Sequence, residues 1–150
     1  AQVDFSEAKR ILDTNLIAAV SIFNLLAEHL EARGEGFLCA LSSVAGERGR
    51  QSNYLYGAAK AGLSTYLQGL RNRLDRSGVR VVTIKPGFVD TRMTFGRPGM
   101  FLVASPEKAG RQIVDAIVKG NDVRYVPGFW RPVMLAIRAI PERLFKRMRL

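Results

Sequence analysis

Cysteine and histidine are almost absent from this chain of 150 residues, which contains one of each. The cysteine, Cys39, lies in an apolar stretch and has no second thiol to pair with. A disulfide framework is therefore excluded, and a reducing compartment is favoured. The histidine, His29, lacks the cluster of neighbouring ligands that a metal ion needs. We expect a cytoplasmic protein without a metal site.

Long apolar runs are also missing. No uninterrupted run approaches the roughly eighteen residues that a membrane span requires, and no signal peptide is recognisable. With 47% hydrophobic and 24% charged residues, the composition is that of an ordinary globular protein. The length suits one domain with a usable core.

Acidic side chains are scarce, because 13 Asp and Glu stand against 23 Lys and Arg and leave a net charge of +10. Seven basic residues and one acidic residue follow position 123, so more than half of the excess lies near the C-terminus. Such an excess favours nucleic acid, anionic lipid or phosphate-bearing substrates as partners. No recognised nucleic-acid-binding motif accompanies it, so nucleic acid is unlikely on sequence grounds.

The side chains that carry chemistry are a serine, a tyrosine and a lysine. Tyr56 and Lys60 begin a helical pattern four residues apart, so both point to one face. Acid–base work at neutral pH requires the phenol pKa to fall from about 10 by roughly three units, or about 4 kcal/mol. An ammonium about 4 Å away supplies roughly that much at an effective dielectric constant of about 20. Tyr56 is therefore a candidate proton donor beside the hydroxyl of Ser43, and the alternative is a chance pair on a structural helix.

Two apolar runs predict buried strands over residues 37–41 and 79–84. The first is too continuous in apolarity for a half-exposed strand, which is typical of a parallel sheet covered on both faces. Ser43 follows the first strand. The second continues into the sequence Pro-Gly-Phe-Val-Asp-Thr at 86–91. Ligands of open parallel sheets bind at this carboxyl edge.

Together these segments resemble the short-chain dehydrogenase/reductase family. The resemblance is carried by Asn15, Ser43, Tyr56-x-x-x-Lys60 and Pro-Gly-x-Val-x-Thr at 86–91, in the family's order and spacing. It implies an α/β fold with a doubly wound, Rossmann-like parallel sheet. It also implies hydride transfer between NAD or NADP and a carbonyl or secondary alcohol.

The resemblance further implies a role for each matching residue. Tyr56 would exchange the proton, Lys60 would lower its pKa and contact the cofactor ribose, and Ser43 would fix the substrate oxygen. Asn15 would open a local irregularity in its helix and complete a water relay to the lysine. The predicted cofactor-binding residues are Tyr56, Lys60, Pro86, Gly87, Phe88, Val89 and Thr91.

The family's early strand, glycine-rich turn and Asn-Ala-Gly segment have no counterpart in these 150 residues. We therefore expect residues 1–150 to be the C-terminal catalytic part of a longer domain, with the N-terminal cofactor-binding half absent from this chain. The residues that decide between NAD and NADP belong to that half, so the sequence does not indicate which cofactor is used.

Helical patterns cover residues 6–32, with Ser6 as the cap, and 55–76, with Gly78 as the stop. Another helix should begin at Ser105 and Pro106. In the family the two long helices pair with those of a neighbouring subunit, which implies a homo-oligomer. The small residues Ala58, Ala59, Ala61 and Gly62 would permit close approach.

Two loops flank the predicted site. Residues 46–53 carry Arg48 and Arg50, which would meet either an anionic substrate or water, and we expect solvent. Residues 92–104 are rich in Met and Phe. The family places a substrate lid here, and an apolar lid suits a lipophilic substrate. The alternative is a segment packed on the body of the protein.

The tail at 128–150 alternates apolar and basic residues at helical spacing, with Trp130 as an aromatic anchor. It would lie on an anionic membrane surface, at the inner face of the membrane, or pack on the domain or another subunit. The tail and the segments around Ser43, Tyr56 and 92–94 resemble reductases of keto-sugars carried on polyprenyl phosphate. The alternatives are a reductase of a soluble ketone or lipid intermediate, and a non-catalytic membrane- or nucleic-acid-binding relative.

Overall fold

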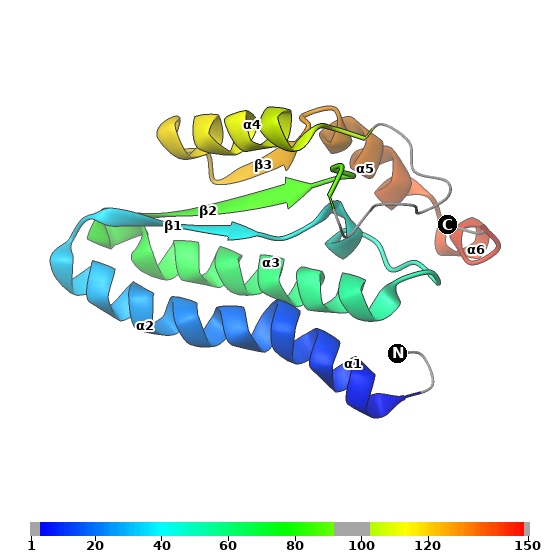
Figure 1. Ribbon diagram of the computed structural model, residues 1–150, viewed down its shortest axis with the longest axis horizontal. Coiled ribbons are helices and arrows are strands. Elements are labelled where there is room, and N and C mark those ends of the chain that lie inside the picture. Colours follow the sequence, from blue (N-terminus) through cyan, green and yellow to red (C-terminus); the bar gives the residue numbers. More distant parts are fainter. Residues whose placement is uncertain (1–3, 92–102, 149–150) are drawn as a thin grey trace.

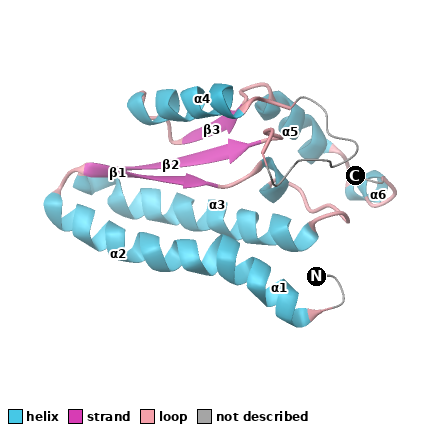
Figure 2. Ribbon diagram, viewed as in Figure 1, coloured by secondary structure: helices cyan, strands magenta, loops and turns pink. Residues whose placement is uncertain are grey.

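The computed structural model describes residues 4–91 and 103–148. A parallel sheet of three strands lies between two helical layers (Figures 1 and 2). In sheet order the strands are β1 (Gly36–Leu41), β2 (Val79–Pro86) and β3 (Val123–Val126). One face carries α2 (Ala18–Arg33) and α3 (Tyr54–Leu74), and the other carries α4 (Pro106–Val118). The predicted α/β, Rossmann-like arrangement is confirmed.

The first helical pattern is interrupted where Asn15 lies. The structure has α1 (Phe5–Leu12), a π-helical turn η1 (Asp13–Ile17) and then α2. The cap is Asp4, whose carboxylate accepts from the Ser6 amide at 2.9 Å, so the prediction of Ser6 as cap was wrong. The helix begins two residues earlier than predicted, so Ser6 lies inside the first turn, and its own amide is one of the orphan donors that Asp4 caps.

The helical stretch Phe5–Arg33 contains an 18-residue window with a mean hydropathy of 1.4, so by length and composition it is apolar enough to cross a membrane. The sequence prediction of no such stretch was wrong because it counted uninterrupted runs, and Asp13 and Asn15 break this one. The core helix of a protein passes the same test, but only 6% of this window is buried, although α1 and α2 lie along α3 (Figure 1).

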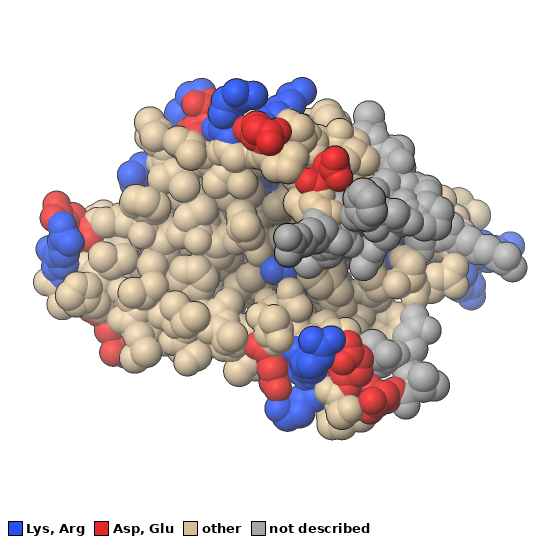
Figure 3. Space-filling view, viewed as in Figure 1, with Lys and Arg blue, Asp and Glu red and all other residues tan. Residues whose placement is uncertain are grey.

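Strand β1 is covered fully on one face and only in part on the other. Leu38 and Ala40 are buried against α2 and α3, whereas Phe37 and Leu41 are 46% and 54% exposed. The predicted burial on both faces holds only in part for this strand. Cys39 is partly buried against the core beneath α4, but α4 lies mainly over β2 and β3 and leaves Phe37 and Leu41 uncovered. Figure 3 shows a wide area over this part of the molecule that is almost without charged side chains.

Strand register brings the two predicted functional segments together. Leu41 pairs with Ile84, and Pro86 pairs with Val126 on the far side of β2. The residues that follow β1 therefore lie beside the Pro86–Gly87 turn, at the carboxyl edge of the sheet. Two apolar cores support this edge, one between the sheet and α2–α3 and the other beneath α4.

The predicted lid at 92–104 falls mostly outside the described residues. Its two ends are adjacent, since Val89 and Ala104 form an isolated bridge. The Ala104 amide donates to the Phe88 carbonyl at 3.0 Å, and the Asp90 amide donates to the Ala104 carbonyl at 2.9 Å. The segment between them thus begins and ends at the same edge of the sheet.

Candidate active site

Ser43 lies in extended backbone just past the end of β1. Its Oγ accepts from the Ala45 amide at 3.1 Å and caps the short 3₁₀ turn η2 (Val44–Gly46). The neighbouring Ser42 is buried, and its Oγ donates to the Lys60 carbonyl at 3.0 Å. The serine pair therefore connects the end of β1 to the first turns of α3.

Two glycines let η2 approach α3 closely. A Cβ on Gly46 would lie 2.7 Å from the Ala61 amide nitrogen, and one on Gly57 would lie 2.9 Å from the Ala45 carbonyl oxygen. Both distances are shorter than carbon atoms tolerate. This close packing sets Ser43 beside the helical turn that carries Tyr56 and Lys60.

Lys60 extends from α3 toward the carboxyl end of β1. Its Nζ donates to the Leu41 carbonyl at 2.9 Å and lies 5.7 Å from the centroid of the Tyr56 ring. Burial lowers the pKa of the Lys60 ammonium, because the charged form loses hydration. The structure thus brings Ser43, Tyr56 and Lys60 together, as the spacing predicts, and their catalytic roles remain predictions.

Asn15 lies in the π-helical turn η1, and its Nδ2 donates to the Ile11 carbonyl at 3.0 Å. Isolated π-helical turns occur frequently at functional sites. The turn packs on α3, where a Cβ on Gly62 would lie 3.1 Å from Leu16. The predicted irregularity is therefore present, while the water relay stays a prediction.

The turn after β2 lies under the helix α5 (Trp130–Ala139). The Gly87 amide donates to the Val126 carbonyl at 2.9 Å, and a Cβ on Gly87 would collide with the buried Trp130 indole. Phe88 meets the same indole edge-on, with ring centroids 5.6 Å apart. Trp130 therefore holds the backbone of the turn that also carries Val89 and Thr91.

A buried carboxylate, that of Glu47, links this turn to the segment 42–47, which we call the serine loop. Its side chain is 5% exposed and forms an ion pair with Lys85, which directly precedes Pro86. Arg138 of α5 donates to the other carboxylate oxygen at 3.1 Å. Burial first, and the Glu47 carboxylate second, raise the pKa of the nearby Tyr125 phenol. Glu47 is thus shared by the serine loop, β2 and α5.

The tail packs on the domain, which is one of its two predicted alternatives. Trp130, Met134 and Phe145 are buried and face protein, whereas Leu144 and Met148 of the same tail remain exposed. Arg48 donates to Glu142 at 2.7 Å, in the short helix α6 (Glu142–Phe145). The expectation of a solvated Arg48 was therefore wrong, because the tail supplies a carboxylate that lies 94 residues away in sequence.

The small residues of α3 do not all face outward. Ala59 is fully buried and Gly62 contacts Leu16 of the same chain, so these two serve packing within the chain. Ala58 is exposed. The prediction that all four small residues permit approach of another subunit is thus wrong for Ala59 and Gly62.

Sequence reasoning missed Ser42, Glu47, Lys85 and Trp130 as parts of this edge. One signal was available, namely a lysine at the end of a strand that is otherwise apolar, because a buried ammonium requires a carboxylate partner. Glu47 and Trp130 carry no comparable signal, since their partners are distant in sequence.

Comparison with known proteins agrees with this geometry. The family model described as short chain dehydrogenase matches residues 1–98. An uncharacterised oxidoreductase of Mycobacterium tuberculosis is 39% identical over 148 residues, which cover 99% of this chain and 59% of that protein. One from Streptomyces coelicolor is 37% identical, with 95% and 56% covered. The chain thus spans less than two thirds of the length of these relatives.

Solved structures share the fold. A short chain dehydrogenase from Burkholderia cenocepacia, in complex with NADP, superposes with a TM-score of 0.75 at 21% identity. The match covers 93% of this chain and 62% of that one. Since the family model matches well over half of the chain, these 150 residues belong to the short-chain dehydrogenase family.

Proposed function

We propose that residues 1–150 form the C-terminal catalytic part of an oxidoreductase. It would move a hydride between NAD or NADP and a carbonyl or secondary alcohol. The observation that carries the proposal is the packing of Ser43, Tyr56 and Lys60 at one carboxyl edge of the sheet, beside the turn at 86–91. Family membership supports the reaction class.

The bound cofactor would supply or accept the hydride. Tyr56 exchanges the proton with the substrate oxygen, Ser43 orients that oxygen by a hydrogen bond, and the Lys60 ammonium favours the ionised phenol. Asn15, in its π-helical turn, holds a water that returns the proton. Each of these groups belongs to the protein, which orients and polarises while the cofactor carries the redox chemistry.

The residues present fit the nicotinamide end of the cofactor. The turn opens at the carboxyl edge of β2, where parallel sheets bind their ligands, and Lys60 places a half-buried ammonium beside it. Pro86, Gly87, Phe88, Val89 and Thr91 would hold the carboxamide. No glycine-rich phosphate turn occurs in the 150 residues, so the pyrophosphate would be held elsewhere in the protein.

We propose a substrate with a lipophilic part. The Met- and Phe-rich sequence of 92–104 and the basic tail support a lipid-linked keto-sugar, and a soluble ketone or lipid intermediate is the alternative. Assays with both classes distinguish them. Binding to anionic vesicles by the whole protein would add a peripheral membrane location to this proposal.

The exposed apolar side of η1 and α2 supports a homo-oligomer. Ile17, Ile22 and Leu25 are each more than half exposed on it. Apolar patches of this kind mark protein interfaces. We propose that α2 and α3 pair with their counterparts in a second subunit.

Replacement of Tyr56 by Phe tests the reaction. It removes the proton and leaves the ring, so we expect carbonyl reduction by the whole protein to fall about a hundred- to ten-thousandfold. Cofactor affinity should change little, as measured by titration with NADH and NADPH. Activity within a few-fold of the parent protein would overturn the assignment.

A further inference from the structure

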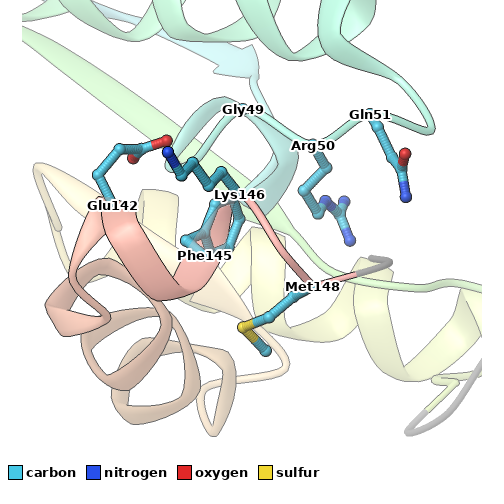
Figure 4. Close-up of a pocket in the computed structure, with 7 residues that line it drawn as sticks. All are labelled: Gly49, Arg50, Gln51, Glu142, Phe145, Lys146 and Met148. Carbon is cyan, nitrogen blue, oxygen red and sulfur yellow. The ribbon is translucent and has the colours of Figure 1, made fainter.

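A pocket of about 170 Å³ lies between the loop at 47–53 and the C-terminal turn α6 (Figure 4). Arg50 extends into it from the loop, and Phe145 and Lys146 line it from the tail. None of its described lining residues belongs to the predicted catalytic or cofactor-binding set. The proposed reaction therefore assigns no role to this pocket.

Arg48, next to the pocket, joins its two sides. Its Nη2 donates to Glu142 Oε2 at 2.7 Å and to the Ile140 carbonyl at 3.3 Å. The guanidinium also lies 4.3 Å from the centroid of the Phe145 ring, within the range of a cation–π interaction. These contacts hold α6 against the loop and neutralise Glu142, the acidic group in the wall.

Arg50, two residues further along the loop, has no such carboxylate partner in the described part of the chain. It is half-buried, and no carboxylate among residues 4–91 and 103–148 pairs with it. Burial lowers the pKa of its guanidinium, because the charge loses water without gaining a counter-ion. A half-buried cation of this kind is stabilised by an anion that a ligand brings.

Lys146 lines the opposite wall with a second positive charge, and its side chain extends toward Glu142 in Figure 4. It is exposed and has no ion-pair partner among the described residues. The segment around it is strongly basic, and such a field concentrates anions near the surface. A guanidinium donates in a planar fork that matches two oxygens of one anion, while an ammonium adds a point charge.

We propose that Arg50 and Lys146 form an oxyanion subsite that binds a phosphate or carboxylate group of the carbonyl substrate. Arg50 precedes Tyr56 by six residues, on the loop that leads from Ser43 to α3, so the subsite adjoins the segment that presents the reacting groups. This assignment rests on the proposed function, and it restricts the substrates to carbonyl compounds that carry an oxyanion.

Binding of inorganic phosphate tests the subsite without the reaction. The whole protein is saturated with NADP⁺, to occupy the cofactor phosphate sites, and is titrated with phosphate or acetate at constant ionic strength. We expect Arg50→Gln to raise the Kd for the anion about tenfold, which is the loss in affinity expected when one charge-assisted hydrogen bond is removed. Arg50→Lys should recover part of this affinity. Such a recovery would show that the pocket still folds when Arg50 is replaced. Unchanged binding in Arg50→Gln would overturn the proposal.

Arg76→Gln is the matched control. It removes one positive charge just beyond the far end of α3, and the 21 residues of that helix separate it from the loop by about 30 Å. Screening at physiological salt should leave its Kd for the anion within about twofold of the parent value. An equal loss in both variants would indicate a general effect of net charge and overturn the subsite.

Turnover measurements then show which class of substrate supplies the anion. They also test the anion subsite separately from the proposed reaction. A ketose phosphate, a keto acid, a polyprenyl-phosphate-linked keto-sugar and a neutral ketone are compared in the whole protein. We expect Arg50→Gln to raise KM about tenfold for an anionic substrate, with kcat and the neutral ketone little changed. The substrate whose KM responds identifies the group. If Tyr56→Phe leaves turnover intact while phosphate binding still depends on Arg50, the reaction fails and the subsite stands.

Discussion

Gly87 is the residue at which α5 presses on the turn after β2. Any Cβ there would overlap the buried Trp130 indole. We therefore predict that Gly87→Ala lowers the free energy of unfolding by about 1–3 kcal/mol, the usual cost of overpacking. Denaturant unfolding of the whole protein measures this change. The nicotinamide-binding turn should shift with it, so the KM for cofactor should rise.

Gly110 offers the control for that substitution. It lies inside α4 with nothing within 4 Å of a Cβ. Gly110→Ala should therefore stabilise the protein by about 0.5–1 kcal/mol, because alanine loses less conformational freedom in a helix. If Gly87→Ala were equally harmless, the close approach of Trp130 would have no energetic consequence.

Local spacing accounts for what could be predicted at the scale of residues. Tyr56 and Lys60 are one helical turn apart, so sequence alone places them on one face. Glu47 could not be found in this way, since its partners Lys85 and Arg138 lie 38 and 91 residues away. A charge pair over such a separation exists only once β1, β2 and α5 are packed.

At the scale of elements, the Glu47 carboxylate connects the serine loop, β2 and α5. Lys85 is 11% exposed, so its ammonium depends on this partner. We predict that Glu47→Gln lowers the free energy of unfolding by about 3 kcal/mol, because it leaves a buried charge without its counter-ion. Since the serine loop is held by the same contact, kcat should fall more than cofactor affinity.

Two further variants separate burial from mere charge. Arg138 is 55% exposed, so Arg138→Gln should cost no more than about 1 kcal/mol. The double variant Glu47→Gln with Lys85→Gln should regain part of the lost stability, because no charge remains buried at that point. If the stability losses of the single variants Glu47→Gln and Lys85→Gln simply add in the double variant, the two side chains do not form a coupled pair.

Periodicity predicted the long helices and the first two strands but not always their surroundings. The tail has an amphipathic pattern that suits either a membrane surface or a protein surface. The structure has Trp130 and Met134 in contact with Val44, a packing that depends on residues far upstream. Likewise, the apolar run in β1 predicts a strand, and what covers its second face depends on other segments.

At the scale of the whole molecule, β1 is a strand with an unpaired edge and exposed apolar side chains among the described residues. Its outer edge pairs with no described strand, and Phe37 and Leu41 remain about half exposed. Open, apolar edges of this kind favour association with further strands. The relatives described above are longer than this chain, and we propose that further residues of the whole protein cover this edge.

The last prediction concerns residues 1–150 alone. They contain the proposed catalytic groups and the turn for the carboxamide, but no glycine-rich turn before a helix N-terminus to bind the pyrophosphate, where much dinucleotide affinity arises. We expect this chain to bind NADH and NADPH poorly, to show no turnover and to self-associate through β1 or α2. Calorimetry and sedimentation measure both properties. Micromolar cofactor binding by a 16.6 kDa monomer would contradict the reasoning, because it would require a phosphate site within these residues.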